Sequence, residues 1–331
     1  MSAETTSAPH WRPVSPCGPA CLTSHETDVA LPVRAARTVA LVTVLLGVVL
    51  VAGPVAVLRG SWRDRVARTV FRALLAACGV RLVVRGDLDG AGRGALVVSN
   101  HISWLDIVGL SAVRPMRALA KREIASWPVL GRLVARSGSV FLDRDRPSTL
   151  PAAVADVSRV LRSGALLSVT PEGTTWCGSA SGRFRPAFFQ AAIDAGVPVR
   201  PVALRYRLAS GRETTRPAFV GTESLVESVR RTVRLRGLVL EVFVCPEIAP
   251  GRAADRGELA ALAQASVQAA LGTTTLVSTV PERARVSKRS VSVGASSLSL
   301  EEGPPCPRCT TTTPCSCSNS ETTRTGSLRS G

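Results

Sequence analysis

Residues 38–58 carry no charged side chain over 21 consecutive positions. As a helix, this stretch is about 31 Å long, which matches the hydrocarbon core of a bilayer. It is longer than the roughly 7–15 apolar residues of a secretory signal and begins farther from the amino terminus. We therefore predict that it enters a membrane, with a buried core helix as the alternative. Gly53 and Pro54 favour a kink, so a full span and a half-inserted helix both remain open.

The charges that flank this stretch predict its orientation. Residues 59–72 hold five arginines and one aspartate, whereas residues 1–37 hold three arginines and three acidic residues. By the positive-inside rule, the rest of the chain lies on the cytoplasmic side of the cell membrane. Arg65, Arg68 and Arg72 share one face of a predicted helix, which indicates an amphipathic helix against anionic membrane lipids. A solvated helix face is the alternative.

Short apolar runs then alternate with helix-like stretches, which predicts an α/β domain with a mixed, largely parallel sheet covered by helices. The domain is expected over residues 80–272. The predicted strands are 80–84, 95–99, 140–142, 165–170, 197–206 and 238–245, and the predicted helices are 147–162, 186–195, 224–236 and 254–271.

The two ends of the chain have a different composition. Residues 1–30 are rich in Ser, Thr and Pro and predict a disordered lead-in, followed by the membrane-associated segment 31–79. Residues 273–331 contain 23 Ser or Thr in 59 positions and no aromatic residue, which predicts a disordered tail. The tail cysteines 306, 309, 315 and 317 have no accompanying histidine or second C-x-x-C, so no metal site is predicted.

The formal net charge of +17 predicts an anionic partner. Nucleic acid is not favoured, because aromatic residues make up only 4% of the chain and no basic stripe alternates with them. The sequence also lacks a phosphate-binding G-x-x-x-x-G-K-[ST] loop, an H-E-x-x-H zinc motif and a G-x-S-x-G nucleophile elbow. Lipids are therefore the expected anionic partner.

His101 is the only histidine in the predicted α/β domain, and it directly follows the predicted strand 95–99. His101 stands at an expected helix start, and Asp106 lies five residues later. Active sites of open α/β sheets form at the carboxyl ends of strands, and a carboxylate beside a histidine fixes its tautomer and favours the imidazolium. The pair is a candidate general base, although a locally satisfied helix-capping histidine is also consistent with the sequence. No paired Ser or Cys nucleophile is evident, so the base would activate a hydroxyl of the substrate.

A second candidate element follows the buried strand 165–170. Pro171-Glu-Gly-Thr174 forms a predicted turn with a carboxylate at the exit of the strand. Gly173 allows a ligand to approach the backbone closely, so Glu172 is a candidate hydroxyl acceptor. A plain turn is the alternative.

Together these motifs resemble those of the glycerophospholipid acyltransferase superfamily, and of the 1-acylglycerol-3-phosphate acyltransferases in particular. The resemblance covers roughly residues 80–245 and rests on four blocks in the order of that family. The blocks are Asn100-His-Ile-Ser-Trp-Leu-Asp106, the segment from Lys121-Arg-Glu-Ile through Phe141-Leu-Asp-Arg144, Pro171-Glu-Gly-Thr174, and Val197-Pro-Val-Arg-Pro-Val202.

The resemblance implies acyl transfer from acyl-CoA or acyl-carrier protein to the hydroxyl of a lysophospholipid, giving phosphatidate. It implies that His101 is the general base and that Asp106 orients it, with no metal, cofactor or covalent enzyme intermediate. The acceptor-binding residues by this resemblance are the cations Lys121 and Arg144, which suit a phosphate, and the turn residues Glu172, Gly173 and Thr174.

One position departs from the family pattern. Phosphatidate-forming members commonly continue P-E-G-T with arginine, whereas this chain has Thr175. Arg183 or Arg185 is a candidate replacement. The alternative is an acceptor without a phosphomonoester, such as lyso-ornithine lipid. A non-catalytic membrane-associated scaffold is the alternative of a different class.

Overall fold

The computed structural model describes residues 13–23, 27–57, 61–88, 94–127 and 130–272. The predicted tail over residues 273–331 lies outside the described residues. The strands are β1 (Val80–Arg85), β2 (Ala95–Ser99), β3 (Arg117–Lys121), β4 (Val140–Leu142), β5 (Leu166–Val169), β6 (Val199–Leu208) and β7 (Leu238–Val244). The helices are α1 (Leu31–Val57), α2 (Ser61–Ala77), α3 (Leu105–Val113), α4 (Leu130–Arg136), α5 (Leu150–Arg162), α6 (Phe189–Ala195), α7 (Leu225–Arg234) and α8 (Arg256–Leu271), with short 3₁₀ turns η1 (Pro19–Cys21), η2 (Arg122–Ser126) and η3 (Pro147–Thr149).

In the described part of the chain, the strands form one sheet in the order β1-β7-β6-β2-β5-β3-β4. Only the β6–β7 pair is antiparallel, and the other pairs are parallel. The predicted mixed, largely parallel sheet is thus confirmed. Because β2, β5, β3 and β4 are parallel, their carboxyl ends meet at one edge, where the loops that follow them lie together.

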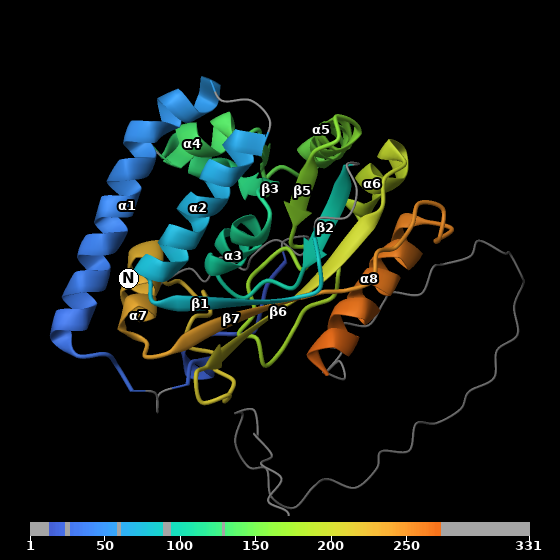
Figure 1. The fold of residues 1–331 in the computed structure, drawn as a ribbon. Coiled ribbons are helices and arrows are strands. Elements are labelled where there is room, and N and C mark those ends of the chain that lie inside the picture. The colour runs from blue at the N-terminus through green and yellow to red at the C-terminus, as the bar shows by residue number, and fades with distance from the viewer. Residues whose placement is uncertain (1–12, 24–26, 58–60, 89–93, 128–129, 273–331) are drawn as a thin grey trace, which may run out of the picture. The chain divides into compact units, whose positions relative to one another are not determined.

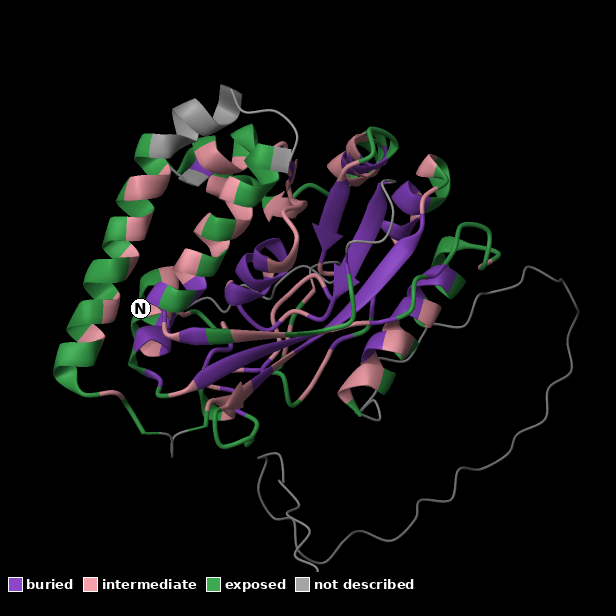
Figure 2. Ribbon diagram, viewed as in Figure 1, coloured by how far each residue is buried: buried purple, intermediate pink, exposed green. Residues whose placement is uncertain are grey.

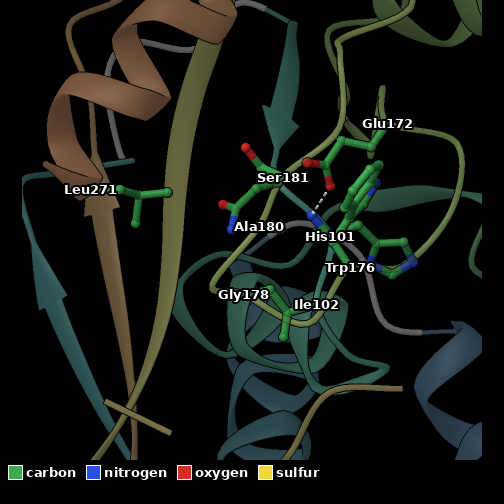
Figure 3. A pocket seen from close by; sticks show the side chains of 9 residues that line it. His101, Ile102, Glu172, Trp176, Gly178, Ala180, Ser181 and Leu271 are labelled. Carbon is green, nitrogen blue, oxygen red and sulfur yellow. Dashed lines mark hydrogen bonds between the residues drawn. The ribbon is translucent and has the colours of Figure 1, made fainter. Parts of the chain in front are cut away.

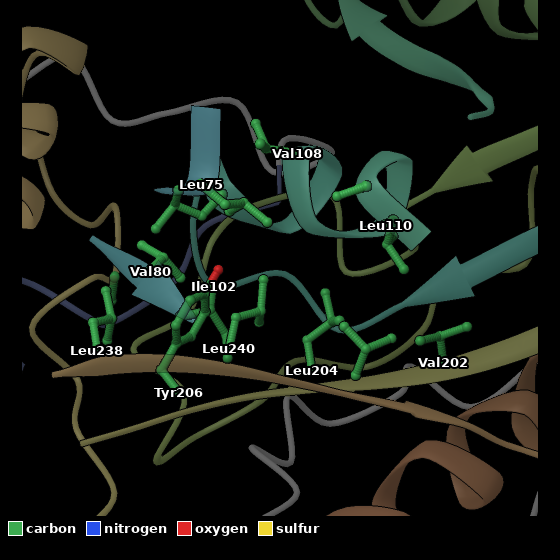
Figure 4. Packing of buried hydrophobic residues seen from close by; sticks show 14 of the residues in the cluster. Leu75, Val80, Ile102, Val108, Leu110, Val202, Leu204, Tyr206, Leu238 and Leu240 are labelled. Atoms are coloured by element: carbon green, nitrogen blue, oxygen red, sulfur yellow. The ribbon is translucent and has the colours of Figure 1, made fainter. Parts of the chain in front are cut away.

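Helices cover both faces of the sheet (Figure 1). One hydrophobic cluster joins α2, α3 and α7 to one face, and Figure 4 shows part of it, including Leu75 and Leu110. The other cluster joins α5, α6 and α8 to the opposite face. Alternate residues of β2 divide between them, since Val97 belongs to the first cluster and Leu96 to the second. This alternation explains why β2 is buried along its whole length.

The sequence did not indicate β3 or α4. Arg117–Lys121 has charged residues at both ends, and its five residues are exposed or half-buried rather than fully buried. It pairs with β5 through only two residue pairs. A short strand close to the sheet edge therefore lacks the apolar run by which the other strands were predicted.

Helices α1 and α2 pack side by side, and α2 also packs against α3 (Figure 1). The segment Leu31–Leu50 of α1 is long and apolar enough to cross a membrane, and none of it is buried (Figure 2). The helix begins seven residues before the predicted uncharged stretch and continues through Gly53 and Pro54. Arg37 donates to the carbonyl oxygens of Val233 and Leu235 at the end of α7, which fixes the start of α1 to the domain.

Residues 13–23 fall within the stretch whose composition predicts a disordered lead-in. In the structure they lie against the α/β domain, where the Thr23 N–H donates to Thr215 Oγ1 (2.9 Å) and the Thr215 hydroxyl donates to the Cys21 carbonyl (2.7 Å). Cys17 is buried. The order of this segment comes from contacts with residues nearly 200 positions away, which local composition does not reveal.

Candidate functional site

His101 lies immediately beyond β2, at the carboxyl edge of the parallel strands. The preceding residue, Asn100, is buried and fixes this turn, because its side-chain amide donates to the Leu204 carbonyl (2.9 Å) and accepts from the Leu204 N–H (2.8 Å). The backbone that carries His101 is therefore bound to the neighbouring strand β6.

Asp106 lies in the first turn of α3 and is almost completely buried. Its Oδ2 atom is 2.9 Å from His101 Nδ1 and accepts the N–H groups of Ile102 (2.7 Å) and Ser103 (2.9 Å). These donors and the helix amino terminus stabilise a buried carboxylate in place of water. The sequence prediction that the two residues form a pair agrees with this geometry.

Tyr206, in β6, completes the surroundings of Asp106. Its hydroxyl donates to Asp106 Oδ1 at 2.7 Å, and burial raises the pKa of Tyr206 well above its usual value of 10. The phenol therefore remains a donor at any physiological pH. Sequence reasoning missed this residue; the available signal was that the only tyrosine of the sequence stands in a predicted strand, between two arginines.

The contact with Asp106 determines which ring atom of His101 is available. With Nδ1 directed at the carboxylate, Nε2 is the nitrogen that can exchange a proton with another molecule. The His101 side chain is 23% exposed, against 2% for Asp106. The pair thus has one buried member that orients and one accessible member that can act as a base.

Glu172 follows β5 and lies beside His101 (Figure 3). Its Oε2 accepts the backbone N–H of His101 (2.7 Å), and its Oε1 accepts that of Gly182 (2.8 Å). Burial raises the pKa of Glu172 to about 8, although both backbone donors act in the opposite direction. Glu172 therefore joins the His101 turn to the loop at Gly182.

Gly173 adopts a φ of 74°, in the left-handed region that glycine tolerates best. Its carbonyl oxygen accepts from Arg144 Nη1 at 2.6 Å, which holds this guanidinium at the turn after β5. A methyl group added at Gly173 would lie 3.8 Å from Arg185 Cδ, so a second arginine lies beside the same glycine. Thr174 is half-buried in this turn.

Lys121 is the last residue of β3 and is exposed. It pairs in register with Leu142 of β4, and Arg144 lies two residues further along that strand's exit. Both predicted cations therefore lie at the carboxyl edge that carries His101 and Glu172. Both proposed replacement arginines are exposed, and Arg185 is the one with a described approach to Gly173.

Thr175 stands where arginine is common in the family. Its hydroxyl donates to the carbonyl oxygen of Phe219. The backbone N–H of the next residue, Trp176, donates to the His101 carbonyl oxygen (2.8 Å). The side chain at 175 therefore ties the turn to a neighbouring loop.

A small pocket opens beside these residues (Figure 3). It is lined by Asn100, His101, Ile102, Glu172, Trp176, Gly178, Ala180, Ser181 and Leu271. An accessible imidazole backed by a buried carboxylate, with cations on the adjacent strand ends, suits deprotonation of a hydroxyl on an anionic molecule.

Comparisons with known proteins identify the family to which the chain belongs. Residues 81–205 match the model of the Acyltransferase family. The chain is 39% identical over 184 residues to a 1-acyl-sn-glycerol-3-phosphate acyltransferase of Neisseria meningitidis, covering 55% of this chain and 72% of that protein. It is 32% identical over 209 residues to a lyso-ornithine lipid O-acyltransferase of Pseudomonas aeruginosa, covering 63% and 79%.

The fold has a solved counterpart in a 1-acyl-sn-glycerophosphate acyltransferase of Thermotoga maritima. The TM-score is 0.57 at 17% identity, over 72% of this chain and 95% of that one. At this identity the likeness concerns the fold. The sequence matches place the chain in the acyltransferase family that includes 1-acyl-sn-glycerol-3-phosphate acyltransferases and lyso-ornithine lipid O-acyltransferases.

Proposed function

We propose that this acyltransferase moves an acyl chain from acyl-CoA or acyl-carrier protein to the free hydroxyl of 1-acylglycerol-3-phosphate, giving phosphatidate. The observation that carries the mechanism is the 2.9 Å contact between His101 Nδ1 and Asp106, which leaves Nε2 to act. A metal or another cofactor has no step in this scheme.

The reaction needs one proton to move twice. His101 Nε2 accepts the proton of the acceptor hydroxyl while the oxygen attacks the thioester carbonyl. A C–O bond forms, the C–S bond breaks, and the imidazolium returns its proton to the leaving thiolate. A positioned base of this kind contributes roughly 10²- to 10⁴-fold in rate. Asp106 stabilises the transient imidazolium.

Glu172 acts in this proposal through the backbone rather than on the acceptor. Both of its oxygens accept backbone N–H groups, one from His101 and one from Gly182. Glu172 is therefore a positioning residue that fixes the base relative to the pocket wall. This differs from the acceptor-binding role that the family resemblance implies.

The acceptor phosphate is assigned to the cations around the neighbouring strand ends. Arg144 is held by the Gly173 carbonyl, Arg185 lies beside Gly173, and Lys121 ends β3. Arginine pairs well with a phosphomonoester because its planar N–H groups bind two oxygens together. Thr174, in the same turn, is the candidate for a contact with the glycerol portion.

A second acceptor, lyso-ornithine lipid, is favoured by position 175. Thr175 supplies no charge, and its hydroxyl is engaged with the Phe219 carbonyl. Similarity to the Pseudomonas aeruginosa enzyme supports this candidate as well. An acceptor without a phosphomonoester has less need of an arginine there.

We further propose that helices α1 and α2 attach the enzyme to anionic membrane lipids from the cytoplasmic side. Gly79, just after α2, lies directly against the Arg37 side chain near the start of α1. Helices α1 and α2 therefore form a helical hairpin in which the end of α2 lies beside the start of α1. A complete crossing by α1 would carry the arginines of α2 into the hydrocarbon core, which is costly. A half-inserted hairpin avoids this cost while exposed α1 side chains such as Leu46 contact lipid.

The deciding experiment supplies the purified full-length protein with labelled acyl-CoA or acyl-carrier protein and a panel of lysolipid acceptors. We expect acylation of lysophosphatidate that falls at least 100-fold in His101→Ala. Activity that survives this substitution contradicts the mechanism. If the protein acylates lyso-ornithine lipid but not lysophosphatidate, then lyso-ornithine lipid is the acceptor and the first proposal for the acceptor is wrong. Folded protein that acylates no acceptor with either donor favours a scaffold.

A further inference from the structure

Three cysteines from distant parts of the sequence meet beside the pocket. The Sγ atoms of Cys17, Cys21 and Cys177 all lie within 4.8 Å of one another. Cys17 and Cys177 are buried, and Cys21 is half-buried. The other two cysteines of the described residues, Cys78 and Cys245, are outside this group.

The loop around Cys177 directs backbone donors at these sulfurs. The Cys177 N–H points at Cys17 Sγ, at 3.4 Å. Burial raises the pKa of the Cys177 thiol to about 11, and the backbone N–H groups of Ala180 and Ser179 act in the opposite direction. Gly178 makes this turn possible through its φ of 95°. Sulfur is a weak acceptor, and donors of this kind matter most when it carries charge.

The spacing also suits a metal ion. In a tetrahedral site with zinc–sulfur bonds of about 2.3 Å, two sulfurs lie about 3.8 Å apart. The sulfurs here therefore need to approach by about 1 Å at most. Thiolates select soft ions such as Zn²⁺ over Mg²⁺ or Ca²⁺.

We propose that Cys17, Cys21 and Cys177 bind one zinc ion, with a solvent molecule as the fourth ligand. Cys21 is the most accessible of the three, so water can reach the open position on its side. The ion would join the amino-terminal segment 13–23 to the loop after Thr175. Since Gly178 and Ala180 of that loop line the pocket, zinc would hold a wall of the active site in place.

The same segment also packs against the domain through its prolines. Pro13 lies so close to Gly173 that an added methyl group would be 2.6 Å from its Cγ, and Pro19 approaches Gly221. Zinc would therefore strengthen an existing arrangement. We expect it to raise the unfolding midpoint of the protein, because a ligand that binds only the folded state stabilises it.

The test uses full-length protein under a phosphine reductant, with Cys306, Cys309, Cys315 and Cys317 replaced by serine so that the tail contributes no thiol. Titration with Zn²⁺ against a chromophoric chelator should show one equivalent per chain. Co²⁺ should give the charge-transfer and visible bands of a tetrahedral thiolate site. A parent protein without one equivalent of zinc, or without these bands, overturns the proposal.

Single variants assign the ligands. Cys17→Ser, Cys21→Ser and Cys177→Ser should each weaken zinc binding at least tenfold, whereas the matched control Cys245→Ser, a buried cysteine outside the cluster, should not. In excess chelator, a folded variant that lacks one of the three cysteines should have an unfolding midpoint close to that of the metal-free parent. Unchanged binding in folded ligand variants overturns the assignment. The assignment is also overturned if protein alkylated immediately after cell lysis contains a Cys17–Cys177 disulfide in place of zinc.

Discussion

The Tyr206 hydroxyl donates to Asp106 Oδ1 at 2.7 Å, on the side of the carboxylate opposite His101. Strand β6 therefore supports a pair whose members come from the loop after β2 and from α3. Hydrogen bonds from buried phenols to carboxylates reduce the cost of burying the charge, and they restrict rotation of the carboxyl group. Tyr206 is thus a positioning residue for the base.

Tyr206→Phe removes this one bond and keeps the ring. We expect kcat to fall about tenfold, with KM for both substrates unchanged, because a bond to a charged group is worth about 1.5–3 kcal/mol and only part of it acts in the transition state. Steady-state kinetics measure this, and the unfolding midpoint serves as the control for stability. An unchanged kcat would show that Asp106 is oriented without the phenol.

Asp106→Asn tests the charge directly. The amide NH₂ would face either the Tyr206 hydroxyl or the donors that meet at Oδ2, from Ile102, Ser103 and His101, so at least one donor would lose its acceptor. We expect kcat to fall about 10³-fold or more, as the histidine loses its tautomer and its counter-charge. Asp156→Asn, at an exposed position on α5, is the matched control. Near-normal turnover in Asp106→Asn would remove the dyad from the mechanism.

The sequence was informative where signals are local. β2 is predicted with its exact ends because all five of its residues are buried and apolar or small. The two members of the His101–Asp106 pair are close in the sequence and directly follow a predicted strand, so the sequence suggests the pair. Tyr206 is 100 positions away from Asp106, and Cys17 is 160 positions away from Cys177. Such pairs depend on strand order and on chain packing, which residue patterns do not specify.

Glu172 predicts a pH dependence of stability. Its pKa is raised by burial to about 8 in the folded protein, against a usual value of 4.5. Between these values the folded state binds more protons than the unfolded state, so stability falls as pH rises, by at most about 1.4 kcal/mol per pH unit, until the loss is complete above about pH 8.

Glu172→Gln should therefore flatten the decline of the unfolding midpoint between about pH 5 and about pH 8. It should also destabilise the fold by about 1–3 kcal/mol near pH 5, since its NH₂ group cannot accept a backbone N–H. Scanning fluorimetry of both proteins across this range measures the two effects. Parallel curves for the two proteins would mean that Glu172 titrates normally.

Arg185 and Arg183 offer a matched pair for acceptor recognition. Both are exposed, but Arg185 lies beside Gly173, where Arg144 is also bound, whereas Arg183 has no described approach to this glycine. With lysophosphatidate, Arg185→Ala should raise KM about 10- to 100-fold with a smaller change in kcat, and Arg183→Ala should leave KM unchanged. Equal effects of the two substitutions would indicate a diffuse electrostatic contribution rather than a phosphate contact.

Leu46 and Leu50 test the membrane attachment, because they are 60% and 77% exposed on α1. A carboxylate at such positions is costly in hydrocarbon, by about 2.5–3.5 kcal/mol each at mid-membrane depth and less near the interface. Leu46→Glu with Leu50→Glu should thus lower binding to phosphatidylglycerol vesicles at least tenfold in flotation assays. Val226→Glu, which introduces one carboxylate at a 58% exposed position on α7, should bind like the parent. Equal loss in both proteins would assign the effect to net charge, and no loss in either would place the attachment elsewhere than on α1.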